Sequence, residues 1–514
     1  MAVWLRERRT STRLGFILQI SCRILFSVLS LIWTPLLLNS MGKALNGLFL
    51  SFQSVATLGG LGDLGMGGVV NIQTSRLLGQ GKHSELHSFL ASARALFLVM
   101  ALVVMAVFFT LTPWLPQWLR FESVSGSGSL TSLFFVGAMS AGLLILSSYI
   151  TNLNYGCGNL TWAVVPLFVL TQFGILSHWL LARGQFPLWA QYLPYVCVTV
   201  LGMLLSWIYV RFSHPSLSEI RQVVFDWKRI SSLLGKSFWL YFYYLAAGIC
   251  MTSDRLLINA GFGADQIPAF VFNYKLCELA LFVVVSASLM SMPKITQWMA
   301  SPDPGERARA VRESERLNKF QTFLGCASAM IYLAVNDTFI KFWLGPDFQV
   351  PLSWQVAFAA QLSVSAAGYL GFDLAARTSD KGIRVGGIAV ISAALLNFGL
   401  SYIAMKRGSI LGIAVATVIA QSCLVLVLGR FTFAQLKMSW WHLSFRNWLL
   451  ALAAVALGFG VKLFIPMDSV AGIALVCGIY VVSLLLTARI LKISFQDIFQ
   501  EIILIRSLFA AKKI

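Results

Sequence analysis

Long apolar runs separated by short polar segments dominate this chain. Each run is close to the roughly 20 residues that an α-helix needs to cross the hydrocarbon core of a bilayer. The pattern predicts an all-α polytopic membrane protein with about 14 membrane-spanning helices, or 12 or 13 if closely spaced runs are merged. The predicted spans are residues 14–38, 44–70, 90–115, 131–154, 160–181, 189–212, 237–260, 265–292, 318–340, 352–376, 383–405, 408–429, 447–465 and 470–491.

The composition supports the same fold class. Hydrophobic residues make up 58% of the chain and charged residues 11%, with a mean hydropathy of +0.78. An ordinary soluble domain carries roughly 25% charged residues, and a soluble fold could not bury this much apolar surface, whereas lipid solvates it. The first run resembles a signal peptide, but its length, Arg23 and the missing small-residue cleavage site predict a retained first span.

The basic residues predict the orientation in the membrane. The chain has a net charge of +19 from 39 Lys and Arg, and these cations are spread over many short loops, as the positive-inside rule describes, rather than gathered in a soluble nucleic-acid-binding patch. With a cytoplasmic N-terminus, 29 of them fall in inside segments, six in outside loops and four within spans. We therefore expect a multi-pass protein with both termini in the cytoplasm and no nucleic-acid partner.

An internal repeat divides the predicted spans into two sets of six. Gln172-Phe-Gly-Ile175 has a counterpart in Asn397-Phe-Gly-Leu400 at an offset of 225 residues. Because six helices separate the copies, both copies would point the same way through the membrane, a known transporter arrangement. The predicted domains are an N-terminal lobe at 1–213, an amphipathic linker at 214–236, a C-terminal lobe at 237–430, and two additional helices with an amphipathic tail at 431–514. Residues 304–319 are also predicted to lie on the membrane surface as an amphipathic helix.

Several ionisable residues lie inside predicted spans, where each costs roughly 2.5–3.5 kcal/mol at the bilayer centre. Internal pairing is one explanation, and Lys275 with Glu278 or Asp373 with Arg377 have suitable helical spacing. Long side chains such as Arg377 and Lys462 could instead reach an interface. The functional alternative is a cationic cavity in which Arg23, Arg255 and Lys275 bind an anionic phosphate group. Asp254, Glu278, Asp373 and Arg377 would then set the cavity charge or couple transport to an ion.

The second span contains a run of glycines that includes Gly59, Gly60, Gly62 and Gly65. It lacks the strand and helix context of a phosphate-binding loop, so it indicates either a hinge or close helix packing. His83-Ser-Glu-Leu-His87 does not have metalloprotease spacing and fits a solvated helix face. No Ser/His/Asp grouping, metal motif or nucleotide-binding loop is present, and we expect no enzymatic activity, cofactor or metal.

At this point the motifs resemble a known family. Asp63-Leu-Gly-Met-Gly-Gly68, Asn71-Ile-Gln-Thr-Ser-Arg76, Ser253-Asp-Arg-Leu-Leu257, Ser291-Met-Pro-Lys294, Phe342-Trp-Leu-Gly345 and the glycines at 408 and 412 are similar to the polysaccharide (O-antigen or exopolysaccharide, Wzx-type) flippases. These belong to the multidrug, oligosaccharidyl-lipid and polysaccharide exporter superfamily. The resemblance covers roughly residues 10–430, and its motifs are loosely spaced.

The resemblance implies a function. A two-lobed bundle would flip a polyprenyl-diphosphate-linked oligosaccharide across the bacterial inner membrane by alternating access, coupled to H⁺ or Na⁺. Its partners would be membrane lipids, the polysaccharide polymerase and other assembly proteins. A multidrug or cation antiporter of the same fold is the alternative, although it would favour an acidic cavity. A membrane-embedded glycosyltransferase would need catalytic carboxylates or a long outside loop, and a non-transporting scaffold leaves the buried cations unexplained.

Overall fold

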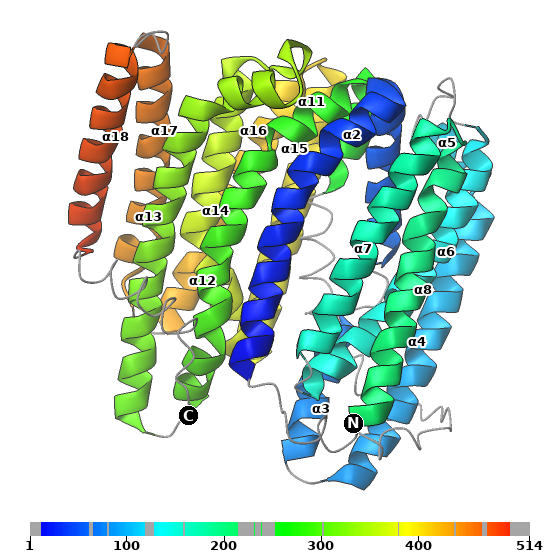
Figure 1. The fold of residues 1–514 in the computed structure, drawn as a ribbon. Helices are drawn as coiled ribbons and strands as arrows, with labels where there is room; N and C mark the ends of the chain where they lie inside the picture. Colours follow the sequence, from blue (N-terminus) through cyan, green and yellow to red (C-terminus); the bar gives the residue numbers. More distant parts are fainter. Residues whose placement is uncertain are drawn as a thin grey trace. The chain divides into compact units, whose positions relative to one another are not determined.

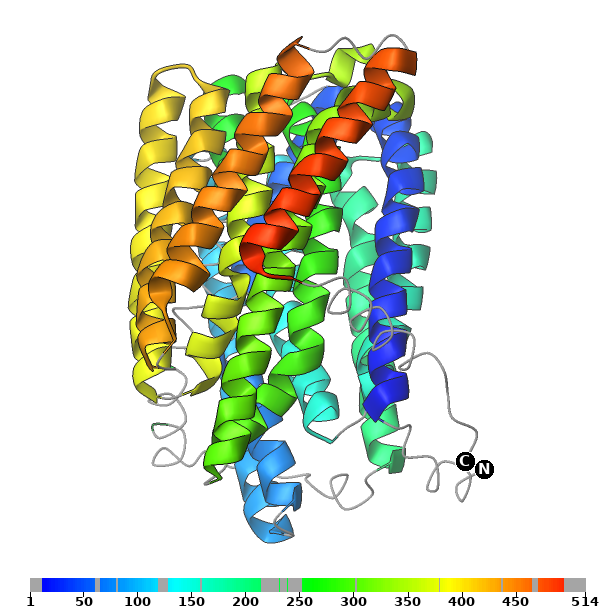
Figure 2. The same ribbon diagram turned by 90° about the vertical axis from the view of Figure 1, so that its left-hand side faces the viewer.

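The computed structural model describes most of the chain as α-helix joined by short turns, and within the described residues no strand is present (Figures 1 and 2). Nine helices of the described part are long and apolar enough to cross a membrane. The predicted all-α polytopic fold is therefore confirmed, while the count of 14 spans stays a prediction. The described residues are 12–60, 65–79, 82–118, 128–157, 160–213, 231, 238, 252–300, 303–378, 380–435, 438–464 and 470–493.

The chain forms two compact units, Met1–Ile267 and Pro268–Ile514. The lobe boundaries predicted from sequence stay predictions. The helices described in the first unit are α2 (Thr12–Gly60), α3 (Met66–Gly79), α4 (His83–Leu111), α5 (Leu115–Trp118), α6 (Leu130–Gly156), α7 (Leu160–Arg183) and α8 (Leu188–Ser213), followed by helical residues 252–262. Helix α11 (Gln266–Asn273) crosses the boundary, and the second unit continues with α12 (Lys275–Ala300), α13 (Pro304–Trp343), α14 (Leu352–Thr378), α15 (Asp380–Lys406), α16 (Ile410–Gln435), α17 (Arg446–Phe464) and α18 (Val470–Leu491).

The internal repeat is visible as a recurring scheme of helix packing. In the first unit α4 packs on α6, α6 on α8, α7 on α8, and α3 on both α4 and α6. An offset of 225 residues relates α3, α4, α6, α7 and α8 to α12, α13, α14, α15 and α16. These helices of the second unit pack in the same pairs: α13 on α14, α14 on α16, α15 on α16, and α12 on both α13 and α14. The two sequence motifs lie in equivalent helices, α7 and α15. The four matched residues thus belong to a repeat that extends over whole helices.

Small residues set the spacing between packed helices. In lipid there is little hydrophobic force between helices, so close backbone approach and van der Waals contact hold them together. A methyl group added at Gly368 of α14 would overlap the Val425 side chain on α16. A larger side chain at position 368 would therefore force α14 and α16 apart or displace Val425.

Two predicted boundaries are wrong. The expected second span, 44–70, is not one helix: α2 ends at Gly60 and α3 starts at Met66, after Gly65 with φ +67°. Within α2, Gly42 with φ +76° and ψ +169° separates the first span from the second. The segment 304–319 is not a separate surface helix either. It is the first part of the 40-residue α13, about 60 Å long, because Asp303 caps the helix and nothing interrupts it before Trp343.

The gap that the sequence predicted between the spans 44–70 and 90–115 is largely helical, because α3 extends to Gly79 and α4 already begins at His83. His83, Glu85 and the exposed Lys82–Glu85 ion pair lie at the start of that helix, in agreement with a solvated face. The predicted linker 214–236 lies outside the described residues except for one helical position, Ser231, and the tail 494–513 lies entirely outside them.

Candidate functional site

Asp254 and Arg255 lie in the helical segment 252–262 of the first unit, close to its packed interior. Asp254 is 8% exposed and Arg255 is half-buried, and each takes part in an interaction with another group. Leu256, the next residue, packs on the apolar cluster around Phe49 and Phe52 of α2. This packing positions the segment against α2, with the Asp254 side chain buried and that of Arg255 half-buried.

Lys275 and Glu278 lie in the first turn of α12 in the second unit and form an ion pair of 2.9 Å between Nζ and Oε2. The Lys275 side chain is 19% exposed and that of Glu278 is 57% exposed. The pairing considered from the i,i+3 spacing is therefore present, and the Lys275 charge is compensated within its own helix. A substrate anion would have to compete with Glu278 for this ammonium group.

The remaining predicted site residues are placed only in part. Arg23 lies in α2, and Asp373 and Arg377 lie in α14, with their side chains outside the described part of the structure. Of the hinge candidates, Gly59 and Gly60 end α2, Gly65 has the left-handed conformation directly before α3, and Gly62 lies outside the described residues. The helix break falls in the glycine run, as a hinge would require, although a hinge role stays a prediction.

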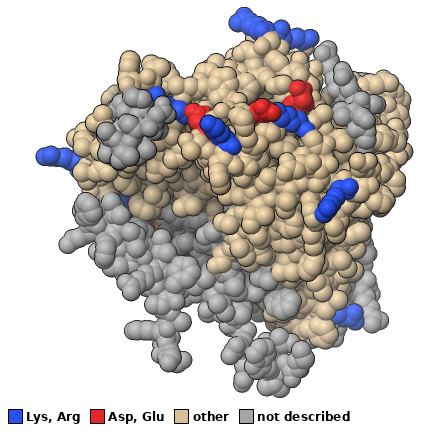
Figure 3. Space-filling view, turned by 45° about the horizontal axis from the view of Figure 1, so that its top comes forward, with Lys and Arg blue, Asp and Glu red and all other residues tan. Residues whose placement is uncertain are grey.

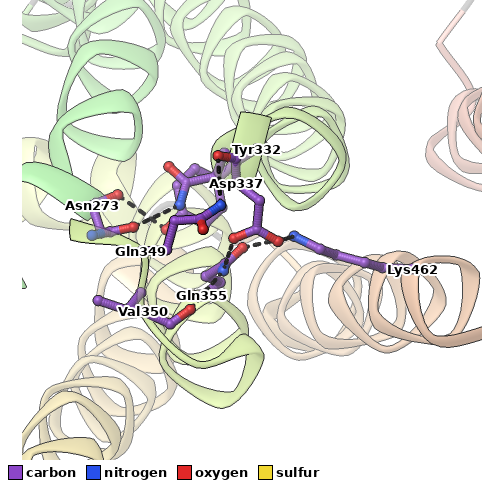
Figure 4. A network of polar contacts seen from close by, with 8 residues as sticks. Asn273, Tyr332, Asp337, Gln349, Val350, Gln355 and Lys462 are labelled. Carbon is purple, nitrogen blue, oxygen red and sulfur yellow. Dashed lines mark hydrogen bonds and ion pairs between the residues drawn. The ribbon is translucent and has the colours of Figure 1, made fainter. Parts of the chain in front are cut away.

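Lys462 of α17 is the centre of a polar network in the second unit (Figure 4). Its Nζ lies 2.6 Å from Oδ2 of Asp337 on α13 and donates a 2.8 Å hydrogen bond to Oε1 of Gln355 on α14. Gln355 in turn donates through Nε2 to Asp337 Oδ1. The Lys462 side chain is 13% exposed and that of Asp337 37%. Lys462 thus links α17 to α13 and α14. Of the two explanations considered from the sequence, internal pairing and extension to an interface, the structure shows internal pairing.

The same network continues along α13 to the turn between α11 and α12 (Figure 4). Asn336 Nδ2 donates to Asn273 Oδ1 at 2.9 Å, and the Tyr332 hydroxyl donates to the Asn273 carbonyl at 3.0 Å. Asn273 itself donates to the Phe348 carbonyl at 2.8 Å. Asn273, Tyr332 and Asn336 are at most 3% exposed. These hydrogen bonds join α11, α13 and the turn at Phe348, and the sequence alone did not point to Asp337 or Asn273.

His178 is a second site that sequence inspection did not identify. This residue of α7 is fully buried, and its Nδ1 lies 2.8 Å from the Tyr195 hydroxyl of α8. Phe49 of α2 lies against the imidazole at a centroid distance of 4.4 Å. Within the described residues the His178 Nε2 and the Gln191 Oε1 have no hydrogen-bond partner. The imidazole can donate to the Tyr195 hydroxyl or accept from it, depending on its tautomer.

A cavity of about 250 Å³ in the first unit combines one cation with apolar walls. Arg94 lies eleven residues into α4, with its guanidinium 5.0 Å from the centroid of the Trp207 ring on α8. The other walls are apolar or aromatic. They are Phe97, Leu98, Leu146, Tyr149, Ile150 and Met203. The predicted span 90–115 placed Arg94 close to the start of a helix, whereas α4 already begins at His83.

Figure 3, with the top of Figure 1 turned forward, shows a face on which Lys, Arg, Asp and Glu are few and scattered among uncharged residues. The distribution of basic residues predicts that the outside loops, which hold few charges, lie on this face. Among the described residues, no group of three or more His, Cys, Asp or Glu side chains could hold a metal ion.

Comparison with solved structures identifies the fold. Over 94% of this chain and 100% of the other, the structure is similar to lipid II flippase MurJ in an inward closed conformation, with a TM-score of 0.64 and 16% identity. It is also similar to an outward-facing multidrug resistance MATE family transporter of the MOP superfamily over 85% of this chain and 98% of that one, with a TM-score of 0.54 and 15% identity. An inward-facing MATE transporter matches over 78% and 95%, with a TM-score of 0.54 and 13% identity.

No protein-family model matches this sequence, and no curated protein matches it in a sequence search. At these identities the likeness establishes the fold, which this chain shares with MurJ and the MATE transporters.

Proposed function

We propose that this protein is a transporter that flips a polyprenyl-diphosphate-linked oligosaccharide, a polysaccharide precursor, across the cytoplasmic membrane by alternating access. The observation that carries the proposal is the likeness to a lipid II flippase over 94% of this chain and 100% of the other. Lipid II is itself a lipid-linked saccharide, so a protein of the same fold with cations in its spans suits an anionic lipid-linked substrate.

The extent of the match favours a flippase over a drug transporter. The MurJ likeness covers 94% of this chain and the MATE likeness 85%. The flippase likeness therefore extends over more of this chain than the drug-transporter likeness does. The pattern of basic residues supports the same choice, because a site for cationic drugs would favour carboxylates.

We assign the diphosphate to Arg23, Arg255 and Lys275. An arginine fork matches two phosphate oxygens, and a half-buried guanidinium such as Arg255 is less screened than one on the surface. Lys275 contributes only when its ion pair with Glu278 opens, so binding of phosphate and release of Glu278 would be linked. The Arg94 cavity, with one cation beside apolar walls, is a further place where an amphiphilic anion can rest during entry.

Ion coupling would use a titratable group in apolar surroundings. Asp254 and Glu278 are the assigned groups, with Asp373 and Arg377 setting the local charge and the glycines at 59, 60, 62 and 65 allowing the helix to bend. His178 is added as a further titratable group, because it is fully buried against Phe49 and the Tyr195 hydroxyl. A proton-coupled flippase would lose its pH dependence in Asp254→Asn or His178→Gln, whereas Na⁺ coupling would leave both pH profiles unchanged and make export depend on sodium.

The test is leaflet-resolved detection of the precursor. In a deletion strain, lipid-linked glycan should accumulate on the cytoplasmic face of the inner membrane, and complementation should expose it to an impermeant glycan-reactive probe. Arg23→Ala with Arg255→Ala should abolish export while membrane insertion remains normal. A matched control is Arg407→Ala, which removes an exposed cation from an outside loop and should export normally.

Two results would contradict the proposal. Normal glycan export in the deletion strain, together with accumulation of cationic dyes in the cells, would establish the antiporter alternative. Full export by the double arginine variant would remove the diphosphate assignment even if the protein is a flippase. Contact with a polysaccharide polymerase and other assembly proteins of the inner membrane is expected only if the deletion strain accumulates lipid-linked glycan. Crosslinking in cells would detect that contact.

A further inference from the structure

A basic pocket lies in the second unit between α13 and the end of α18, and none of the residues assigned above to transport lines it. Its volume is about 210 Å³. Four cations and one carboxylate line it: Arg312, Arg316, Lys319 and Lys492 with Glu315, beside the apolar Phe320 and Ile493. Helices α13 and α18 are in contact, and α13 continues well beyond the end of α18 (Figure 1).

The carboxylates nearby do not neutralise the pocket. Lys319 pairs with Glu315 at 3.1 Å, and Arg316 lies 4.0 Å from Glu313. Arg312 and Lys492 have no carboxylate partner within the described part of the chain, and both are exposed. Excess positive charge in a concave site of this size favours a bound anion.

A further cation lies behind the pocket. Arg446, at the start of α17, donates through Nη1 to the carbonyl of Ile490 in α18 at 3.4 Å, and Glu315 is close enough to interact with its charge. The Arg446 Nε and Nη2 atoms are buried and have no hydrogen-bond acceptor among the described residues. Buried charged donors without an acceptor are unfavourable unless a ligand or water supplies one.

Lys492 has an unusual backbone conformation for its position. Helix α18 ends with hydrogen bonds from Lys492 N to the Arg489 carbonyl at 3.1 Å and from Ile493 N to the Ala488 carbonyl at 2.9 Å. This is the Schellman arrangement, in which glycine is usual at the residue that adopts the left-handed conformation. Here a lysine adopts it, with φ +54°. A cation occupies a position where glycine would be more stable, and its side chain lines the pocket.

The pocket lies at the level of the lipid head groups. The 17 residues of α13 from Phe320 to Asn336 carry no charge, and at 1.5 Å per residue they extend about 25 Å, nearly the thickness of the hydrocarbon core. Arg446 and Lys462 enclose a similar uncharged stretch of α17. Trp440, Trp441 and Phe445 pack together directly before Arg446, as aromatic side chains do at membrane interfaces.

We propose that this pocket is a binding site for the phosphate of an anionic membrane phospholipid, held by Arg312 and Lys492, with the charge of Arg446 nearby and the acyl chains along the α13–α18 contact. Basic pockets between membrane helices at the headgroup level bind anionic lipids in this way. The site is independent of the proposed flippase activity, because it contains none of the assigned transport residues. Its occupant is a constituent lipid of the membrane that binds α18 to α13.

The test uses the purified full-length protein in detergent, titrated with phosphatidylglycerol, phosphatidylcholine or inorganic phosphate while lipid retention is followed by native mass spectrometry. The test variant is Arg312→Gln with Lys492→Gly, in which glycine relieves the left-handed residue, so loss of binding cannot follow from an unstable helix end. The matched control is Lys406→Gln with Arg407→Gln, two exposed cations at the other end of the second unit.

Wild type and the control should retain phosphatidylglycerol in preference to phosphatidylcholine. Each basic residue near an anionic lipid contributes about fivefold in affinity, so the test variant should bind phosphatidylglycerol roughly 30-fold more weakly. Equal retention by wild type and the test variant would overturn the proposal. Equal retention of the two lipids would overturn it as well, and competition by inorganic phosphate at the same concentration would identify a free-anion site instead.

Discussion

The ion pair between Lys462 and Asp337 gives a quantitative test of how α17 is attached to the second unit. Replacing Lys462 with Met keeps the volume of the aliphatic stem and removes the charge. The substitution leaves Asp337 Oδ2 and Gln355 Oε1 without the donor that now lies 2.6 Å and 2.8 Å away. The perturbation therefore acts on three helices at once, although only one residue changes.

The expected magnitude follows from burial. Exposed ion pairs contribute about 0.2–1 kcal/mol, and breaking a fully buried pair by removing one partner costs about 3–5 kcal/mol. The Lys462 side chain is 13% exposed but that of Asp337 is 37% exposed, so water partly screens the carboxylate. We expect a coupling of about 1–2 kcal/mol between the two side chains, between the exposed and buried limits.

A double-mutant cycle measures this coupling directly. Lys462→Met, Asp337→Asn and the double variant would be unfolded in mixed micelles with increasing SDS, and the free energy of unfolding compared with wild type. The matched control is the cycle Lys82→Met with Glu85→Gln, a 3.1 Å pair whose side chains are 51% and 55% exposed. That control should give a coupling below about 0.5 kcal/mol.

The reasoning is refuted if the Lys462–Asp337 coupling is no larger than that of the exposed control. In that case the buried network would not hold α17 in place, and apolar packing between α17 and α13 would have to do so. A coupling above about 3 kcal/mol would also contradict the estimate, because it would require Asp337 to behave as a fully buried group.

Two further predictions concern packing and orientation. Gly368→Ala should lower the yield of folded protein and its melting temperature, because the new methyl group would overlap Val425. The control Gly399→Ala has nothing within 4 Å of the added methyl group and should be neutral or slightly stabilising. Fluorescence-detected size exclusion would compare the two variants. In a cysteine-free background, an impermeant maleimide should label Arg407→Cys in intact cells and Glu306→Cys only after permeabilisation. The distribution of basic residues predicts that these two positions lie on opposite sides of the membrane. The reverse labelling pattern would overturn the predicted orientation.

The local patterns that the sequence predicted well are those that depend only on chemistry and periodicity. Apolar runs can be read without contacts, because a helix in lipid satisfies its own backbone hydrogen bonds. The Lys275–Glu278 pair could be anticipated because residues three apart on a helix are neighbours wherever the helix lies. Helix boundaries were less certain. Nothing in residues 304–319 distinguishes a surface helix from the start of a long α13.

The sequence alone predicted the fold class and an expected orientation. Both depend on how each residue type partitions between lipid and water, and not on which residues it contacts in the folded protein. The partners of single polar residues were not predicted, because they depend on which helices become neighbours. Lys462 is the clearest case: only packing of α17 against α13 and α14 brings it to Asp337 and Gln355. His178, Arg94 and the basic pocket at Lys492 likewise arise from helices distant in sequence, so the tertiary structure alone decides which polar groups in this protein act together.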